Sequence, residues 1–185
     1  MKNIAVLIPI TSNNRNWKTL KQTDFYCYFL KTFFATYNAE HSYTLYLGID
    51  NNDKLYNKES VQEEIDRFIK IMKNASVKMI FFDNEKYKGK PCWIWNELFK
   101  DAIKENNDYY VQCGSDISFL DKNWVDCAMN NLDCKNGLGV VGLVDQGRKE
   151  IYPQDTLLTQ TMVTKKHYEI FEFYFPWNLP SWSSD

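Results

Sequence analysis

The stretch YYVQCGSDISFL, residues 109–120, decides the fold. It begins with large residues that favour extended backbone and suit a buried strand. It then changes to small and polar residues at Gly114, Ser115 and Asp116 before apolar residues return. A strand that ends in a carboxylate is typical of α/β proteins, in which ligands bind beyond the carboxyl ends of parallel strands. The stretch therefore predicts a fold class and the edge of the sheet at which a site should lie.

Strand and helix patterns alternate along the rest of the chain. Continuous apolar runs indicate strands buried on both faces, and apolar residues at helical spacing indicate helices between them. The predicted strands cover residues 4–8, 43–50, 77–83, 108–113, 137–144 and 156–164, and the predicted helices cover residues 24–37, 60–72, 91–103, 122–132 and 165–174. Ser60 and Glu63 fit a capping box, and Pro91 suits the first turn of a helix. We expect one Rossmann-like α/β domain over 1–185, with a mostly parallel central sheet flanked by helices.

The composition excludes several classes of protein. The 185 residues carry a formal net charge of −2, from 22 basic and 24 acidic residues, which gives no electrostatic basis for binding nucleic acid. No apolar run is long enough to span a bilayer, and the N-terminal run MKNIAVLIPI is too short for a signal peptide and lacks a cleavage site. The five cysteines are odd in number and widely spaced. They predict reduced thiols in a cytoplasmic protein, with neither a disulfide framework nor a zinc site.

Asp116 is the first candidate for a functional residue. A carboxylate at the ligand-binding edge of a parallel sheet can hold Mg²⁺ or Mn²⁺, whose coordination is completed by substrate phosphates. Gly114 and Ser115 are small enough to let a diphosphate approach the backbone. The alternative is that Asp116 caps the following turn, which is a common role for a lone Asp after a strand.

Asp50 ends the second predicted strand and is the second candidate. It could accept hydrogen bonds from a ribose hydroxyl or a base N–H. The alternative is an Asx-turn within the run DNND, residues 50–53. Asp53, in the same run, is expected to be solvated.

The segment before the helix at residue 91 is the third candidate. Lys88, Gly89 and Lys90 precede a helix N-terminus, which attracts anions, although a solvated loop is the alternative for the lysines. Asn96 could reach a sugar or a phosphate, or form a buried hydrogen bond.

The two histidines do not fit a catalytic triad, because no serine–aspartate or cysteine pattern lies near them. His167 could supply a third metal ligand, although a place on a helix surface is commoner. His41, just before a strand, is expected to be exposed.

Together these motifs resemble the nucleotide-sugar-binding core of GT-A fold glycosyltransferases, especially family 2-like ones. IAVLIPITSNNR resembles their first strand and nucleotide loop, and LYLGIDNND resembles their second strand, whose Asp contacts the uracil or ribose. GKPCWIWNELFKDAIKENNDYYVQCGSDI resembles the helix and strand that lead to a DxD metal motif. FPWNLPSWSSD resembles the acceptor side, where a tryptophan precedes an acidic residue. The motifs occur in the family's order over essentially the whole chain, and the compact GT-A domains of large DNA viruses are the most similar.

The chain departs from that family at its metal motif. Gly114 occupies the first position of DxD, and only Asp116 matches. One carboxylate and a diphosphate can still hold an ion. The chain also ends at Asp185, early for this fold, which predicts an excised or truncated domain.

The resemblance implies a metal-dependent glycosyltransferase that moves a sugar from a nucleoside-diphosphate sugar, most simply a UDP-sugar, to a glycan or glycoprotein acceptor. Mn²⁺ or Mg²⁺ would neutralise the diphosphate leaving group, and a viral member would act in the host cytoplasm. The expected site residues are Asp116 and His167 as metal ligands; Pro9, Thr11, Arg15, Asp50, Lys90, Asn96, Ser115 and Asp116 around the nucleotide sugar; Trp177 and Trp182 at the acceptor; and Asp185 as the catalytic base.

Two alternatives stay open. A nucleotidyltransferase can share the α/β core, but it usually carries a glycine-rich basic loop after the first strand, and PITSNNRN has no glycine. A non-catalytic binding module that keeps the fold is favoured by Gly114 in place of an aspartate.

Overall fold

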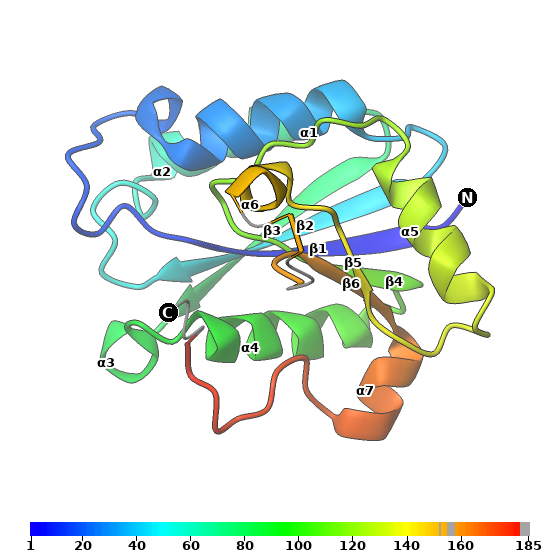
Figure 1. The fold of residues 1–185 in the computed structure, drawn as a ribbon. Coiled ribbons are helices and arrows are strands. Elements are labelled where there is room, and N and C mark those ends of the chain that lie inside the picture. Colours follow the sequence, from blue (N-terminus) through cyan, green and yellow to red (C-terminus); the bar gives the residue numbers. More distant parts are fainter. Residues whose placement is uncertain (152, 155–157, 182–185) are drawn as a thin grey trace.

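A computed structural model describes residues 1–151, 153–154 and 158–181, and its strands and helices alternate as predicted (Figure 1). The strands are β1 (Asn3–Ile10), β2 (Ser42–Asp50), β3 (Ala75–Phe82), β4 (Tyr109–Gln112), β5 (Val141–Gly142) and β6 (Thr161–Thr164). The helices are α1 (Lys31–Thr36), α2 (Glu59–Lys70), α3 (Asn84–Tyr87), α4 (Pro91–Lys104), α5 (Trp124–Asp133), α6 (Gln146–Ile151) and α7 (Lys165–Phe171).

The strands form one sheet in the order β3-β2-β1-β4-β6-β5. Neighbouring strands from β3 to β4 are parallel, whereas β6 runs antiparallel to both β4 and β5. The predicted mostly parallel sheet is therefore confirmed. From β1 the chain builds the sheet first towards β2 and β3 and later towards β4, so the strand order reverses between β1 and β4, and ligands of α/β sheets bind near such a point.

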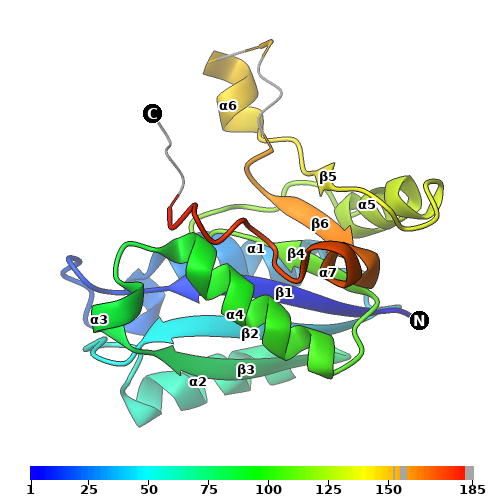
Figure 2. The same ribbon diagram turned by 90° about the horizontal axis from the view of Figure 1, so that it is seen from below.

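Helices cover both faces of the sheet (Figure 1). Ile4, Val6 and Ile8 of β1 pack with the side of the core that holds α1, α2 and α5, whereas Ala5 and Leu7 pack with α4. All five side chains are fully buried, which explains why β1 has no polar alternation. Figure 2 shows α4 lying across β1 and β2, and α6 standing away from the rest of the molecule.

Two predicted strands are shorter in the structure. Of residues 137–144, only Val141–Gly142 pairs with another strand, because Gly137 and Gly139 adopt positive φ angles that extended strands do not use. Of residues 156–164, the paired part is Thr161–Thr164.

The helix predictions also need correction at their N-termini. Residues Phe25–Leu30 form a π-helical segment that leads into α1, in place of one α-helix over 24–37. Lys58 is the N-cap of α2, so the predicted capping box of Ser60 and Glu63 does not form. Pro91 does occupy the first turn of α4, as predicted. Among the helices of the described ranges, none has both the length and the apolar character needed to cross a membrane.

Candidate functional site

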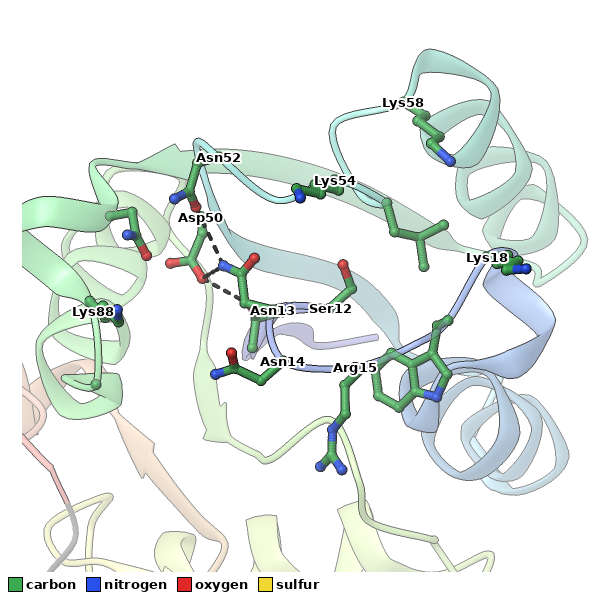
Figure 3. A pocket seen from close by; sticks show the side chains of 15 residues that line it. Ser12, Asn13, Asn14, Arg15, Lys18, Asp50, Asn52, Lys54, Lys58 and Lys88 are labelled. Atoms are coloured by element: carbon green, nitrogen blue, oxygen red, sulfur yellow. Dashed lines mark hydrogen bonds between the residues drawn. The ribbon is translucent and has the colours of Figure 1, made fainter.

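A cavity of about 570 Å³ opens at the carboxyl edge of β1, β2 and β3 (Figure 3). It is lined by residues from 11–18 after β1, from 50–58 at the end of β2 and beyond it, and from 84–89 in and after α3. The cavity thus lies at the carboxyl edge of the sheet, the edge that the sequence predicted.

Asp50 connects two walls of the cavity. Its Oδ2 accepts hydrogen bonds from the Thr11 hydroxyl at 2.9 Å and from the Asn13 amide at 3.0 Å, both from the loop after β1. The Asn13 amide also lies 3.3 Å from Oδ1 of Asn52 (Figure 3). Among the described residues, none donates to Oδ1 of Asp50. That oxygen can accept a hydrogen bond from a ligand.

Asp53 was expected to be solvated, and this expectation is wrong. Its side chain is 1% exposed, and its carboxylate accepts hydrogen bonds from five groups. The donors are the Ser12 amide (2.5 Å) and hydroxyl (2.7 Å), the Thr11 hydroxyl (3.3 Å), and the amides of Leu55 (2.9 Å) and Tyr56 (2.8 Å). Asp53 therefore fixes the loop after β1 against the loop after β2.

Positive charge dominates the cavity wall. The charged lining residues are five cations and one carboxylate, a formal balance of +4: Arg15, Lys18, Lys54, Lys58 and Lys88 against Asp50. Arg15 lies 3.9 Å from Asp24, but no described carboxylate forms an ion pair with any of the four lysines. The whole chain carries a net charge of −2, so these cations are a local concentration and not a general feature of the surface. Such a concentration attracts anionic ligands.

Some of the predicted nucleotide-site residues line the cavity, and others lie outside it. Thr11, Arg15 and Asp50 line the cavity, but Pro9 lies half-buried within β1 and does not. Lys90 also lies outside the cavity, because its Nζ donates to the carbonyl of Lys86 at 2.9 Å and lies 4.2 Å from the ring centroid of Trp93. Lys88, two residues earlier, lines the cavity in its place.

Asn96 makes the buried hydrogen bonds that were the alternative to a ligand contact. The side chain is 0% exposed. Its Nδ2 donates to the carbonyl of Phe175 at 2.8 Å, and its Oδ1 accepts from the amides of Tyr174 at 3.0 Å and Phe175 at 2.8 Å. Asn96 thus holds the C-terminal segment against α4 and has no free polar atom for a donor sugar.

Ser115 and Asp116 lie in a turn after β4 and do not line the cavity. Asp116 is exposed, and none of the described residues donates a hydrogen bond to it, so it does not cap the following turn. Its Oδ1 would lie 2.7 Å from a Cβ atom at position 114, so the carboxylate folds back over Gly114. Within the described ranges, no three His, Cys, Asp or Glu side chains are grouped to hold a metal ion.

His167 does not join Asp116 in a metal site. It lies on α7, which follows β6, and Thr164 at the end of β6 pairs with Tyr109 at the start of β4. His167 is therefore at the opposite edge of the sheet from Asp116. Its imidazole packs against the ring of Phe171, and burial lowers the pKa of His167, although hydrogen bonds to backbone groups oppose that effect.

His41 is buried, contrary to the expectation that it would be exposed. Its Nε2 lies 2.9 Å from Oδ1 of Asp126 on α5. Burial raises the pKa of Asp126, but hydrogen bonds from His41 and Asn38 outweigh burial and hold that pKa below its ordinary value. This pair connects α5 to the turn before β2 and lies outside the cavity lining.

The predicted acceptor side is described only in part. Trp177 is 38% exposed and packs on α4, with its ring 6.2 Å from that of Trp93 and 4.8 Å from Nζ of Lys100. Trp182 and Asp185 lie outside the described residues.

Similarity to solved structures identifies the fold. Mannosyltransferase PcManGT from Pyrobaculum calidifontis, in complex with GDP-Man and Mn²⁺, gives a TM-score of 0.59 at 11% identity and covers 94% of this chain and 47% of that chain. S. aureus TarS, residues 1–349, gives 0.55 at 14% identity, with 95% and 50% covered. The chain has a GT-A-like fold. A cytidylyltransferase from Leptospira borgpetersenii gives 0.55 at 11% identity, with 97% and 68% covered.

These similarities confirm the predicted GT-A fold and extend no further than the fold. The chain spans about half the length of PcManGT and of TarS 1–349. No protein-family model matches the sequence, and no curated protein matches it. The viral origin inferred from the resemblance stays a prediction.

Proposed function

We propose that this chain binds a nucleoside-diphosphate sugar in the carboxyl-edge cavity and transfers the sugar to an acceptor. The observation that carries this proposal is the balance of +4 on the cavity wall of a chain whose net charge is −2. A diphosphate is the anionic group that such a cavity would neutralise. The GDP-Man bound to PcManGT, which has the same fold, supports this assignment.

The two ends of the ligand would meet different side chains. Oδ1 of Asp50 would accept a hydrogen bond from the ribose or the base, because its other oxygen already holds the loop after β1. The diphosphate would lie among the lysines and Arg15, whose planar guanidinium suits phosphate oxygens. Since Asp53 fixes the loops before any ligand arrives, little ordering would oppose binding.

Transfer would require a base opposite the donor. The acceptor hydroxyl would attack the anomeric carbon, the bond from that carbon to the diphosphate would break, and the base would take the hydroxyl proton. We keep Asp185 as the proposed base, with Trp177 and Trp182 as proposed acceptor contacts, on the resemblance of FPWNLPSWSSD to the family's acceptor side.

The resemblance implies a divalent cation, and the described side chains offer few ligands for one. Asp116 is a single exposed carboxylate, the first DxD position is Gly114, and His167 lies at the other edge of the sheet. These described residues do not fit a metal site built by protein side chains, so the proposed transfer is assigned to the chain's own residues.

A panel of UDP-glucose, UDP-N-acetylglucosamine and GDP-mannose tests the proposal, with thermal shift and donor hydrolysis as the two measurements. A donor at about a hundred times its dissociation constant should stabilise the fold by roughly 2.7 kcal/mol, or about 5–11 °C for a domain of this size. Stabilisation with hydrolysis supports the transferase, stabilisation without hydrolysis supports the binding module, and no stabilisation by any donor refutes the proposed ligand class.

A nucleotidyltransferase is the second candidate, favoured by the cytidylyltransferase, of which this chain covers 68%. The cavity's cations would suit a nucleoside triphosphate as well. The absence of glycine from the loop PITSNNRN counts against it. Pyrophosphate release from CTP or UTP with a sugar phosphate, and no hydrolysis of diphosphate sugars, would establish this alternative in place of the glycosyltransferase.

A further inference from the structure

We infer that side-chain cations of the cavity, and not a metal ion held by protein carboxylates, neutralise the diphosphate of the ligand. This inference rests on the proposed function and concerns how the site holds the negative charge that develops on the leaving group. It departs from the metal-dependent reaction that the family resemblance implies.

Most described carboxylate oxygens in the run DNND, at the end of β2, are already held by protein donors. Asp53 is occupied by five donors, and Oδ2 of Asp50 by two. Asp50 and Asp116 follow β2 and β4, which are separated by β1. Two strand spacings amount to roughly 10 Å, whereas two oxygens bound to one Mg²⁺ at about 2.1 Å each lie within about 4 Å of one another. The strand order alone therefore does not bring these two carboxylates together at one ion.

The loop after β4 offers a single carboxylate at its metal-motif positions. With Gly114 at the first DxD position, only Asp116 can approach an ion there. The Asp116 carboxylate folds back over Gly114. If position 114 were an aspartate, its Cβ atom would force the Asp116 carboxylate to turn away. A lone exposed carboxylate supplies one ligand of the six that an octahedral ion takes, with the other positions left to water and phosphate.

Cationic side chains, in contrast, are plentiful in the cavity. Lys88 and Arg15 approach the cavity from different elements, the turn after α3 and the loop after β1 (Figure 3). Lys88 follows the helical turn directly, and Gly89 after it adopts φ +69°, which separates Lys88 from Lys90. The Lys88 ammonium has no ion-pair partner among the described residues, so an anionic ligand would be its first. Lys18, Lys54 and Lys58 add further positive charge to the same cavity.

Cations of this kind can replace a metal in the same electrostatic role. Lysine and arginine groups aimed at a leaving phosphate stabilise its developing charge as Mg²⁺ does. The expected consequence is nucleotide binding that persists when divalent cations are removed.

The test is calorimetric titration of UDP and of GDP into the full chain, in buffer with EDTA and in buffer with Mn²⁺. The better of the two nucleotides should bind in EDTA with a Kd within about threefold of its Kd in Mn²⁺. Lys88→Gln should weaken that binding about tenfold or more in EDTA, since a lost charge-assisted contact contributes at least about one power of ten. Asp116→Asn should leave the Kd within about twofold. Lys70→Gln, which removes a lysine paired with Asp66 at the other end of α2, is the matched control and should have no effect.

Two results would overturn this inference but leave the proposed function standing. One is binding that needs Mn²⁺, with a Kd at least about thirtyfold weaker in EDTA and a metal effect that Asp116→Asn removes. The other is unchanged binding by Lys88→Gln in EDTA. Binding of neither nucleotide under either condition would overturn the proposed function itself, and the inference with it.

Discussion

Asp53→Asn is the substitution that most directly tests how the cavity is built. The carboxylate is 1% exposed and accepts five hydrogen bonds, three of them from the backbone amides of Ser12, Leu55 and Tyr56. Asparagine keeps the shape of the side chain but replaces one acceptor oxygen with a donor NH₂ group.

The loss of unfolding free energy in Asp53→Asn depends on which backbone amide loses its acceptor oxygen. If the NH₂ group takes the place of Oδ2, it faces the Ser12 amide; if it takes the place of Oδ1, it faces the amides of Leu55 and Tyr56. Each buried donor left unsatisfied costs about 1–3 kcal/mol, and the remaining hydrogen bonds lose their charge assistance. We expect a loss of about 2–4 kcal/mol of unfolding free energy, or roughly 4–16 °C in Tm for a domain of this size.

The assay is thermal and urea unfolding without any ligand, with Asp50→Asn as the matched control. Among the described residues, only the movable side chains of Thr11 and Asn13 donate hydrogen bonds to Asp50, so Asp50→Asn should cost less than about 1 kcal/mol. Asp50→Asn should nevertheless weaken nucleotide binding, because it removes the negative charge from the side chain that accepts a hydrogen bond from the ligand. A melting temperature for Asp53→Asn within about 1 °C of the wild-type value would refute the role assigned to Asp53.

Three further predictions concern residues outside the cavity. Asn96→Ala removes the side chain that forms hydrogen bonds with the backbone of residues 174–175, so the unfolding free energy should fall by about 2–4 kcal/mol. Proteolysis after this segment should become faster, and an unchanged cleavage rate would contradict the anchoring role. Because burial holds the pKa of His167 below its ordinary value of 6.5, the unfolded chain takes up a proton first as the pH falls, and stability should decline below about pH 6.5. In urea titrations His167→Phe should show less of this decline, and an identical pH profile would count against the burial argument. Iodoacetamide at pH 8 should modify the exposed Cys127 in the folded protein but not the buried Cys113, whose thiol pKa is raised by burial; equal labelling would contradict the packing.

The fold could be predicted from the sequence wherever an apolar run had to be buried. Residues 4–8 have no polar alternation, and β1 is covered on both faces. The same reasoning failed at residues 137–144, where Leu138 is 54% exposed and Gly137 and Gly139 turn the backbone away from a strand. An apolar run predicts a strand only when its backbone can stay extended.

The place of the candidate residues at the carboxyl edge could be predicted from the sequence, but their burial and their hydrogen-bond partners could not. Asp50 and Asp53 belong to one run, DNND, yet one carboxylate keeps a free oxygen and the other is buried under five donors. The loop backbone decides this difference, and no local pattern shows it. Lys88 and Lys90 likewise flank Gly89, whose positive φ sends the two side chains to different surroundings.

The location of bound nucleotide tests the central claim most directly. A crystal structure of the chain with UDP or GDP should show density in the cavity at the carboxyl edge, with the nucleoside against Asp50 and the diphosphate within reach of Lys88. A second cavity of about 440 Å³ lies at the opposite edge of the sheet, between Asn106 and Lys166. Nucleotide bound there, with the carboxyl-edge cavity holding none, would contradict the account.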